Sequence, residues 1–191
     1  MISLKKIIIL LLFIIPVNIK AYDTSATSAI LMEQETNRIL YAKNIHAKRS
    51  VASISKIMTA ILAIESDKLY DTITVTNVVN KAYGSGIYIK PGEEIKLIDL
   101  VYGLMLRSGN DAALQIANIV SENEMKFVEL MNEKAKQLKM DDTTFNNPSG
   151  LEENGGNISS ACDMAILMSY AMKNEIFRMI TGTRTVSYTH L

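Results

Sequence analysis

A hydroxyl and an amine stand at a spacing that suits acyl transfer. Ser53 and Lys56 lie three residues apart at the start of an apolar run, so a helix beginning there places both side chains on one face, one turn apart. A serine hydroxyl is a poor nucleophile without a base, and a lysine becomes a base when burial or positive potential destabilises its ammonium. A helix N-terminus supplies such potential and favours a developing oxyanion. The pair predicts Ser53 as nucleophile and Lys56 as general base.

A second polar group follows the apolar segment Leu97–Leu106. Ser108-Gly109-Asn110 offers a hydroxyl that can relay a proton and an amide that can hydrogen-bond a peptide-like substrate. Each motif has a structural alternative. S-x-x-K also occurs where a serine caps a helix ahead of a surface lysine, and Gly and Asn also form ordinary turns between helices.

Together the two motifs resemble those of a known family. The segments Ala52–Ala60 and Leu106–Ala113 are similar to the low-molecular-mass serine D-alanyl-D-alanine carboxypeptidases, a class of penicillin-binding protein. Three further segments agree with the family pattern: Ser28–Met32, Lys90–Glu93 and Asn147–Leu151. The resemblance extends from about Ser25 to Gly182.

The resemblance implies a reaction and its partners. Ser53 would attack the carbonyl between the two terminal D-alanines of a peptidoglycan stem peptide, and water would hydrolyse the acyl-enzyme after D-alanine leaves. β-Lactams would acylate the same serine. Lys56 would accept the serine proton, Ser108 would pass a proton towards the leaving amine, and Asn110 would hold the substrate backbone. No cofactor or metal is implied.

The third element of this family is missing from the sequence. A K-T-G strand binds the substrate carboxylate and carries an oxyanion donor in such enzymes, but Ile180-Thr181-Gly182 lacks the cation and precedes that strand in the family order. We therefore expect a catalytic domain that is incomplete at its C-terminus and weakly active or inactive as it stands. The residues Ser187–Leu191 do not resemble the family, and we expect the C-terminal membrane anchor that many relatives carry to be absent from this chain.

Two other functions remain open. A class A β-lactamase shares the first two motifs and adds a Glu-x-x-x-Asn loop, which Glu153 and Asn157 fit literally. They lie in a polar loop where such residues are common, and the surrounding segments resemble carboxypeptidases. The other alternative is a non-catalytic cell-wall-binding fragment, because the missing strand removes the carboxylate clamp.

Composition excludes several classes of protein. Lys plus Arg and Asp plus Glu are equal at 20 each, so no net field favours nucleic acid or an anionic membrane surface. Cys162 is the only cysteine, which excludes an intrachain disulfide and a multi-thiolate metal site, and we interpret it as a small buried hydrophobe. Of the two histidines, His46 sits in a polar connection and is interpreted as a surface residue.

The first residues indicate export. Lys5 and Lys6 precede the apolar run Ile7–Val17, and small Ala21 follows a short polar stretch, which is the pattern of a signal peptide. The run is short against the ~20 residues that a spanning helix needs. We expect residues 1–21 to be a signal peptide, residues 22–191 to be the N-terminal part of the catalytic domain, and the protein to be extracytoplasmic.

The expected fold is α+β, of the β-lactamase and transpeptidase type, with an antiparallel sheet flanked by helices and with its final strands missing. A helical lobe should bring Ser108 and Asn110 opposite the helix of Ser53. Ser55 is interpreted as a structural hydroxyl and Tyr88 as a packing residue. Periodicity and turn residues predict β-structure at Ser28–Met32, Arg38–Ala42, Ile73–Thr76 and Ile87–Ile89. They predict helices from Ser53 to about Asp67, Leu97–Leu106, Asp111–Val120, Glu124–Leu138 and Ser160 to about Met172. A long loop is expected at Asp141–Gly156.

Overall fold

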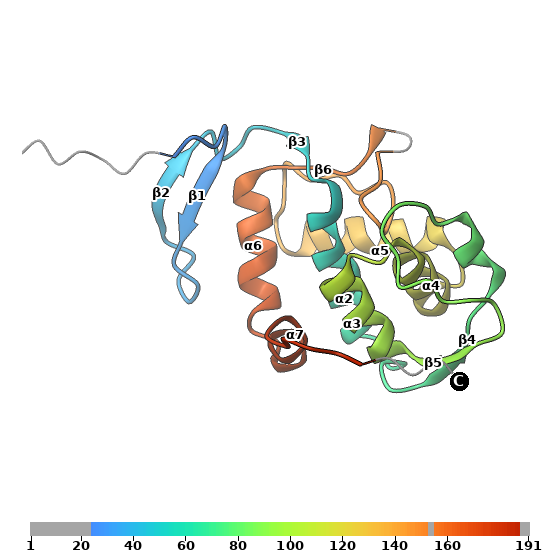
Figure 1. Ribbon diagram of the computed structural model, residues 1–191. Coiled ribbons are helices and arrows are strands. Elements are labelled where there is room, and N and C mark those ends of the chain that lie inside the picture. The colour runs from blue at the N-terminus through green and yellow to red at the C-terminus, as the bar shows by residue number, and fades with distance from the viewer. Residues whose placement is uncertain (1–23, 153–154, 188–191) are drawn as a thin grey trace, which may run out of the picture.

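The structure, a computed structural model, describes residues 24–152 and 155–187. It is an α+β fold in which helices surround one apolar core and short antiparallel strand pairs lie at the periphery (Figure 1). The expected α+β class is therefore confirmed. The predicted signal peptide lies outside the described residues. In the part of the chain that is described, no helix combines the length and the apolar character needed to cross a membrane.

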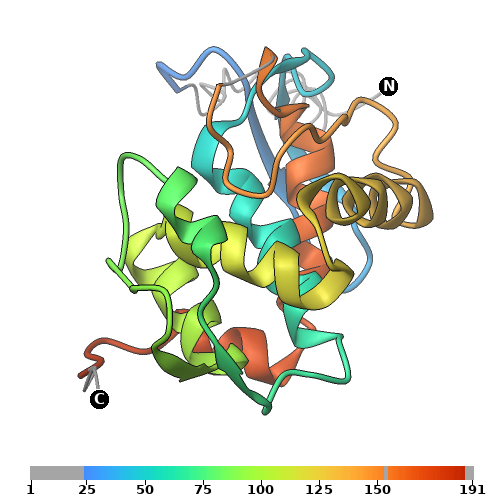
Figure 2. The same ribbon diagram turned by 90° about the vertical axis from the view of Figure 1, so that its right-hand side faces the viewer.

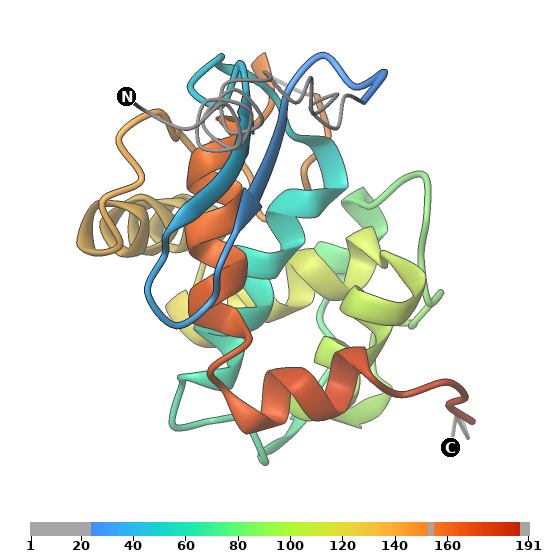
Figure 3. The same ribbon diagram turned by 90° about the vertical axis from the view of Figure 1, so that its left-hand side faces the viewer.

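An N-terminal hairpin forms where two short apolar segments on either side of a polar turn predicted it. Strand β1 (Ala29–Met32) pairs antiparallel with β2 (Ile39–Lys43). The connecting turn is closed by the carboxylate of Glu33, which accepts the backbone N–H of both Glu35 and Thr36. The hairpin lies across the outer side of helix α6 (Ala161–Ala171), as Figure 3 shows.

Helix α2 (Lys56–Ile64) is the centre of the core. Every residue except Leu62 is buried, as expected for a helix that is apolar almost all round. It contacts α3 (Leu97–Arg107), α4 (Asn110–Ser121) and α6. The helix ends three residues before the predicted end at Asp67. Its N-terminal extension is a separate 3₁₀ turn, η1 (Ala52–Ser55), which carries Ser53.

The predicted helical lobe is present. Helix α4 packs against both α3 and α5 (Glu124–Gln137), and all three helices contact α2 (Figure 2). Asn123 caps α5 by accepting the N–H of Lys126, and Ser160 caps α6 by accepting the N–H of Asp163. A further helix, α7 (Glu175–Thr181), was not predicted. It contacts α2 and α3 and buries Phe177 and Ile180.

The remaining strands are short. Strand β4 (Thr72–Thr74) pairs with β5 (Glu94–Lys96), and β3 (Arg49–Ser50) pairs with β6 (Ile158–Ser159), so the described residues form three separate two-stranded ladders. A 3₁₀ turn, η2 (Asn77–Lys81), follows β4. The prediction of β-structure at Ile87–Ile89 is wrong. The backbone N–H groups of this segment bind the carboxylate of Asp111 instead of a neighbouring strand.

Candidate active site

Ser53 and Lys56 come together as their spacing predicted. The Nζ atom of Lys56 lies 3.2 Å from Oγ of Ser53. Ser53 is exposed, whereas Lys56 is only 2% exposed at the first residue of α2. The turn before α2 is not regular helix, because Ala52 has a left-handed φ of 41°. This turn presents the Ser53 hydroxyl to solvent while the Lys56 amine stays inside the protein.

The Lys56 amine has neutral oxygen partners. Besides Ser53 Oγ, Nζ donates to Oδ1 of Asn110 at 2.8 Å and to the backbone carbonyl of Ser149. Burial lowers the pKa of Lys56 from 10.5 to about 8, because a low-dielectric environment disfavours the ammonium form. The amine is therefore partly neutral near pH 8, as a general base must be.

Asn110 is held by backbone contacts on its other side. Its Nδ2 donates to the carbonyl of Tyr83 at 2.7 Å, and its backbone N–H donates to the carbonyl of Ser85 at 2.8 Å. Asn110 is 4% exposed and begins α4. These bonds fix the side chain so that Oδ1 faces Lys56. The structure thus joins the two predicted motifs, while substrate binding by Asn110 stays a prediction.

Ser108 occupies the junction between α3 and α4. It is the C-cap of α3, with a left-handed φ of 55°, and only Gly109 separates it from the first residue of α4. Within the described residues, no hydrogen bond joins Ser108 to Ser53, Lys56 or Asn110. Its predicted role as proton relay is not tested by these contacts.

The segment Asn147–Gly150 completes the surroundings of Lys56, although the motifs predict no role for it in the site. The carbonyl of Pro148 accepts from Oγ1 of Thr59 at 2.7 Å, and the next carbonyl binds Lys56. Gly150 has a φ of 82°, and a Cβ there would lie 2.0 Å from the carbonyl oxygen of Ala52. A signal was present in the Asn-Pro-Ser-Gly composition, which favours a tight turn inside the long loop.

Asn157 belongs to the structural framework. It is fully buried, its Oδ1 accepts the N–H of Asn146 and Asn147, and its Nδ2 donates to Ser55 Oγ and to the Asn147 carbonyl. The amide therefore has no free hydrogen-bonding group for a catalytic water. Glu153, its partner in the β-lactamase alternative, lies outside the described residues. That alternative is not favoured.

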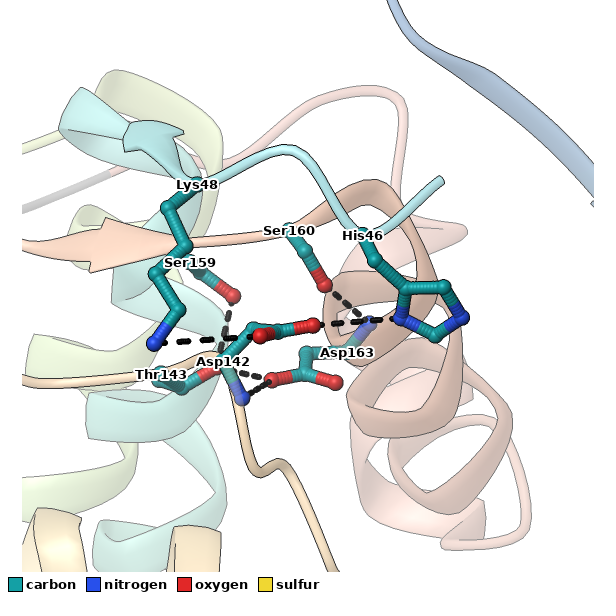
Figure 4. A network of polar contacts seen from close by, with 7 residues as sticks. All are labelled: His46, Lys48, Asp142, Thr143, Ser159, Ser160 and Asp163. Atoms are coloured by element: carbon teal, nitrogen blue, oxygen red, sulfur yellow. Dashed lines mark hydrogen bonds and ion pairs between the residues drawn. The ribbon is translucent and has the colours of Figure 1, made fainter. Parts of the chain in front are cut away.

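A second polar cluster extends from the surface, where His46 lies, to buried Ser159, Ser160 and Asp163. Nδ1 of His46 is 3.1 Å from Oδ2 of Asp142, and the histidine side chain is 68% exposed, so the prediction of a surface histidine is confirmed. Asp163 in turn accepts from the Asp142 N–H and from Oγ1 of Thr143. Figure 4 shows the cluster, which consists of His46, Lys48, Asp142, Thr143, Ser159, Ser160 and Asp163. The contacts attach the loop after α5 to the beginning of α6.

Three other predictions can be compared with the structure. Cys162 is buried, as predicted. The near match to K-T-G lies in the last turn of α7, where Thr181 Oγ1 donates to the Phe177 carbonyl, so it is helical. The packing role predicted for Tyr88 is wrong, because its side chain is among the most exposed large hydrophobics, at 72%.

Comparison with known proteins agrees with this geometry. The sequence matches the D-alanyl-D-alanine carboxypeptidase family over residues 16–190. The chain belongs to this family. The resemblance inferred from the motifs is thereby confirmed.

Individual family members show how far the likeness extends. The D-alanyl-D-alanine carboxypeptidase DacF of Bacillus subtilis is 39% identical over 163 residues, which are 83% of this chain and 42% of that protein. Among solved structures, penicillin binding protein 6B from Escherichia coli matches with a TM-score of 0.83 and 29% identity over 92% of this chain and 59% of that one. A D-alanyl-D-alanine carboxypeptidase from Mycobacterium tuberculosis matches with a TM-score of 0.81 and 29% identity, over 85% and 61%. The chain thus spans less than half the length of this Bacillus relative.

Proposed function

We propose that this chain is the N-terminal part of the catalytic domain of a serine D-Ala-D-Ala carboxypeptidase. The observation that carries the proposal is the buried amine of Lys56, 3.2 Å from the exposed hydroxyl of Ser53. An amine whose pKa is lowered to about 8 by burial can accept a proton that an ordinary lysine would not. Because the chain belongs to the carboxypeptidase family, we infer that this pair catalyses the carboxypeptidase reaction.

The reaction has two half-steps. Neutral Lys56 accepts the proton of Ser53 Oγ as that oxygen attacks the carbonyl between the two D-alanines of a stem peptide. The tetrahedral intermediate collapses, the C–N bond breaks, and a proton passed through Ser108 converts the leaving nitrogen into the amine of free D-alanine. Water then attacks the acyl ester while Lys56 takes a proton from it, and Lys56 returns this proton to Ser53 Oγ as the ester bond to that oxygen breaks. Asn110 orients both the lysine and the peptide backbone.

The proposal includes the location and the inhibitors of the enzyme. A peptidoglycan substrate lies outside the cytoplasm, which fits the signal peptide pattern of residues 1–21. β-Lactams carry an amide-type carbonyl that Ser53 would attack, and several family relatives are named penicillin-binding proteins. We propose an exported enzyme that acts at the cell wall and is acylated by penicillins.

Intact-mass spectrometry after incubation with a penicillin tests the proposal. The chain is compared with the product of its reading frame extended through the K-T-G motif, each with a Ser53→Ala control. The longer form should gain one penicilloyl mass that Ser53→Ala abolishes, and the short chain should gain little, since it lacks the carboxylate clamp. If neither form is acylated, Ser53 is not the nucleophile, and a cell-wall-binding fragment becomes the better description.

A further inference from the structure

Tyr88 combines two features that packing does not explain. Its side chain is 72% exposed, although burying an aromatic ring is a large source of stability. Its backbone has a left-handed φ of 61°, which is sterically disfavoured for a bulky residue. A residue that gains no burial and adopts a disfavoured backbone conformation calls for a functional explanation.

The carboxylate of Asp111 holds this conformation. Asp111 is 5% exposed, and its two oxygens accept the backbone N–H groups of Ile87, Tyr88 and Ile89, with the Tyr88 bond at 2.6 Å. Oδ1 also accepts the N–H of Ala112. Hydrogen bonds to an ionised acceptor are about twice as strong as neutral ones. The bonds orient the backbone on both sides of Tyr88, so that the ring faces outward.

The loop that leads to Tyr88 contacts the candidate active site, because Asn110 donates hydrogen bonds to the carbonyls of Tyr83 and Ser85. Tyr88 lines two adjoining cavities of about 310 and 410 Å³, and Gly86 also lines both. Gly84 lines the smaller one, and a Cβ there would be 3.3 Å from Nδ2 of Asn110. Backbone that lines this cavity thus adjoins Asn110, which contacts Lys56 directly.

We propose that Tyr88 is a specificity-determining residue that contacts the peptide segment on the acyl side of the reacting bond, and that Asp111 is the positioning residue that holds it. On the other side of the bond the substrate carries a single D-alanine, which is too small to fill either cavity. The acyl side carries the rest of the stem peptide, and aliphatic side chains pack well on an aromatic ring. This inference depends on the proposed function for the identity of the substrate.

Peptides of different length test the role of Tyr88. In a Ser53→Ala background, which prevents turnover, the affinities for an acyl-D-Ala-D-Ala dipeptide and for a stem pentapeptide are measured by NMR titration. Tyr88→Ala should weaken pentapeptide binding about three- to tenfold, the range for an aromatic contact, and leave dipeptide binding within about twofold. Tyr88→Phe should retain the pentapeptide affinity. The matched control is Tyr70→Ala, since Tyr70 is 66% exposed and lines neither cavity.

Steady-state kinetics provide a second readout, measured on the form of the protein that reacts with penicillin. Loss of a contact present in both ground state and transition state raises KM and leaves kcat unchanged. Tyr88→Ala should therefore raise KM for the pentapeptide without changing kcat. Equal pentapeptide affinity in the parent and Tyr88→Ala would overturn the inference even if Ser53 is acylated. If Ser53 is not acylated but Tyr88→Ala still weakens pentapeptide binding, the proposed function is overturned and the role of Tyr88 in binding is not.

Hydrogen exchange tests the role of Asp111 without requiring activity. Asp111→Asn keeps the side-chain shape but removes an acceptor oxygen, so amide protection at residues 87–89 should fall at least about tenfold. The control is Asp163→Asn, because Asp163 is also buried and also accepts a backbone N–H, at Asp142. That variant should leave protection at residues 87–89 unchanged. Unchanged protection in Asp111→Asn would show that Asp111 does not position Tyr88.

Discussion

The side-chain amide of Asn157 donates a hydrogen bond of 2.9 Å to Oγ of Ser55. Ser55 in turn donates to the carbonyl of Ala52 at 2.7 Å, across the 3₁₀ turn that carries Ser53. Neither Asn157 nor Ser55 is exposed to solvent. The long loop therefore fixes the shape of the turn that presents the candidate nucleophile, and these contacts support the structural role predicted for Ser55.

Replacing Asn157 should destabilise the protein strongly. Asn157→Ala leaves the N–H groups of Asn146 and Asn147 without their shared acceptor, and an unsatisfied buried polar group costs about 1–3 kcal/mol. We expect the free energy of unfolding to fall by about 2–4 kcal/mol in urea denaturation. Exposed Asn77→Ala should change it by less than about 0.5 kcal/mol. A similar small effect at Asn157 would contradict the framework role.

Helices with a clear apolar stripe were predicted well. Helices α3, α4 and α5 each lie within about two residues of their predicted ends, because burial of one face at a period of 3.6 residues is encoded locally. Helix α6 was located by its cap, in which Ser160 accepts the N–H of Asp163. The Ser53–Lys56 pair was predicted for the same reason, since one turn of helix brings the two side chains together.

The errors arose where distant side chains determine the backbone. Ile87–Ile89 has the composition of a strand, but Asp111 accepts its N–H groups, and a pairing between residues about 22 to 24 apart in sequence is not a local signal. The third partner of Lys56, the carbonyl of Ser149, lies 93 residues away from it. The Asn-Pro-Ser-Gly composition indicates a turn at this segment, but every residue has a backbone carbonyl, so residue types do not show which carbonyl binds Lys56.

Gly150 should be irreplaceable for a reason that goes beyond its backbone angle. Gly150→Ala would place a Cβ 2.0 Å from the Ala52 carbonyl oxygen, within the turn of Ser53. Gly92 is the matched control, because its φ of 92° is also left-handed but a Cβ there would meet nothing within 4 Å. We expect Gly92→Ala to cost about 1–2 kcal/mol of stability and Gly150→Ala at least about 2 kcal/mol more. Equal losses in thermal or urea unfolding would show that the Ala52 turn adjusts freely.

The stability of the protein should depend on the ionisation of Lys56. Burial lowers its pKa to about 8 from 10.5, so between these values the folded protein binds fewer protons than the unfolded chain. Stability contributed by this group therefore rises with pH from about 8 to 10.5 and is lowest, and flat, below about 8. The rise should disappear in Lys56→Met, measured by urea unfolding across this range, and persist in exposed Lys90→Met. An unchanged profile in Lys56→Met would show that the ammonium is not penalised by burial.

Acylation of Ser53 should follow the same ionisation if Lys56 is the base. The second-order rate constant for penicillin acylation reports ionisations in the free enzyme, so it should rise about tenfold per pH unit below pH 8 and level off above it. Lys56→Arg should abolish acylation, because a guanidinium stays protonated at every accessible pH, whereas Lys90→Arg should retain the parent profile. The measurement is stopped-flow or mass-spectrometric acylation on the form of the protein that reacts. A rate independent of pH between 6 and 8, or activity retained in Lys56→Arg, would exclude Lys56 as the proton acceptor.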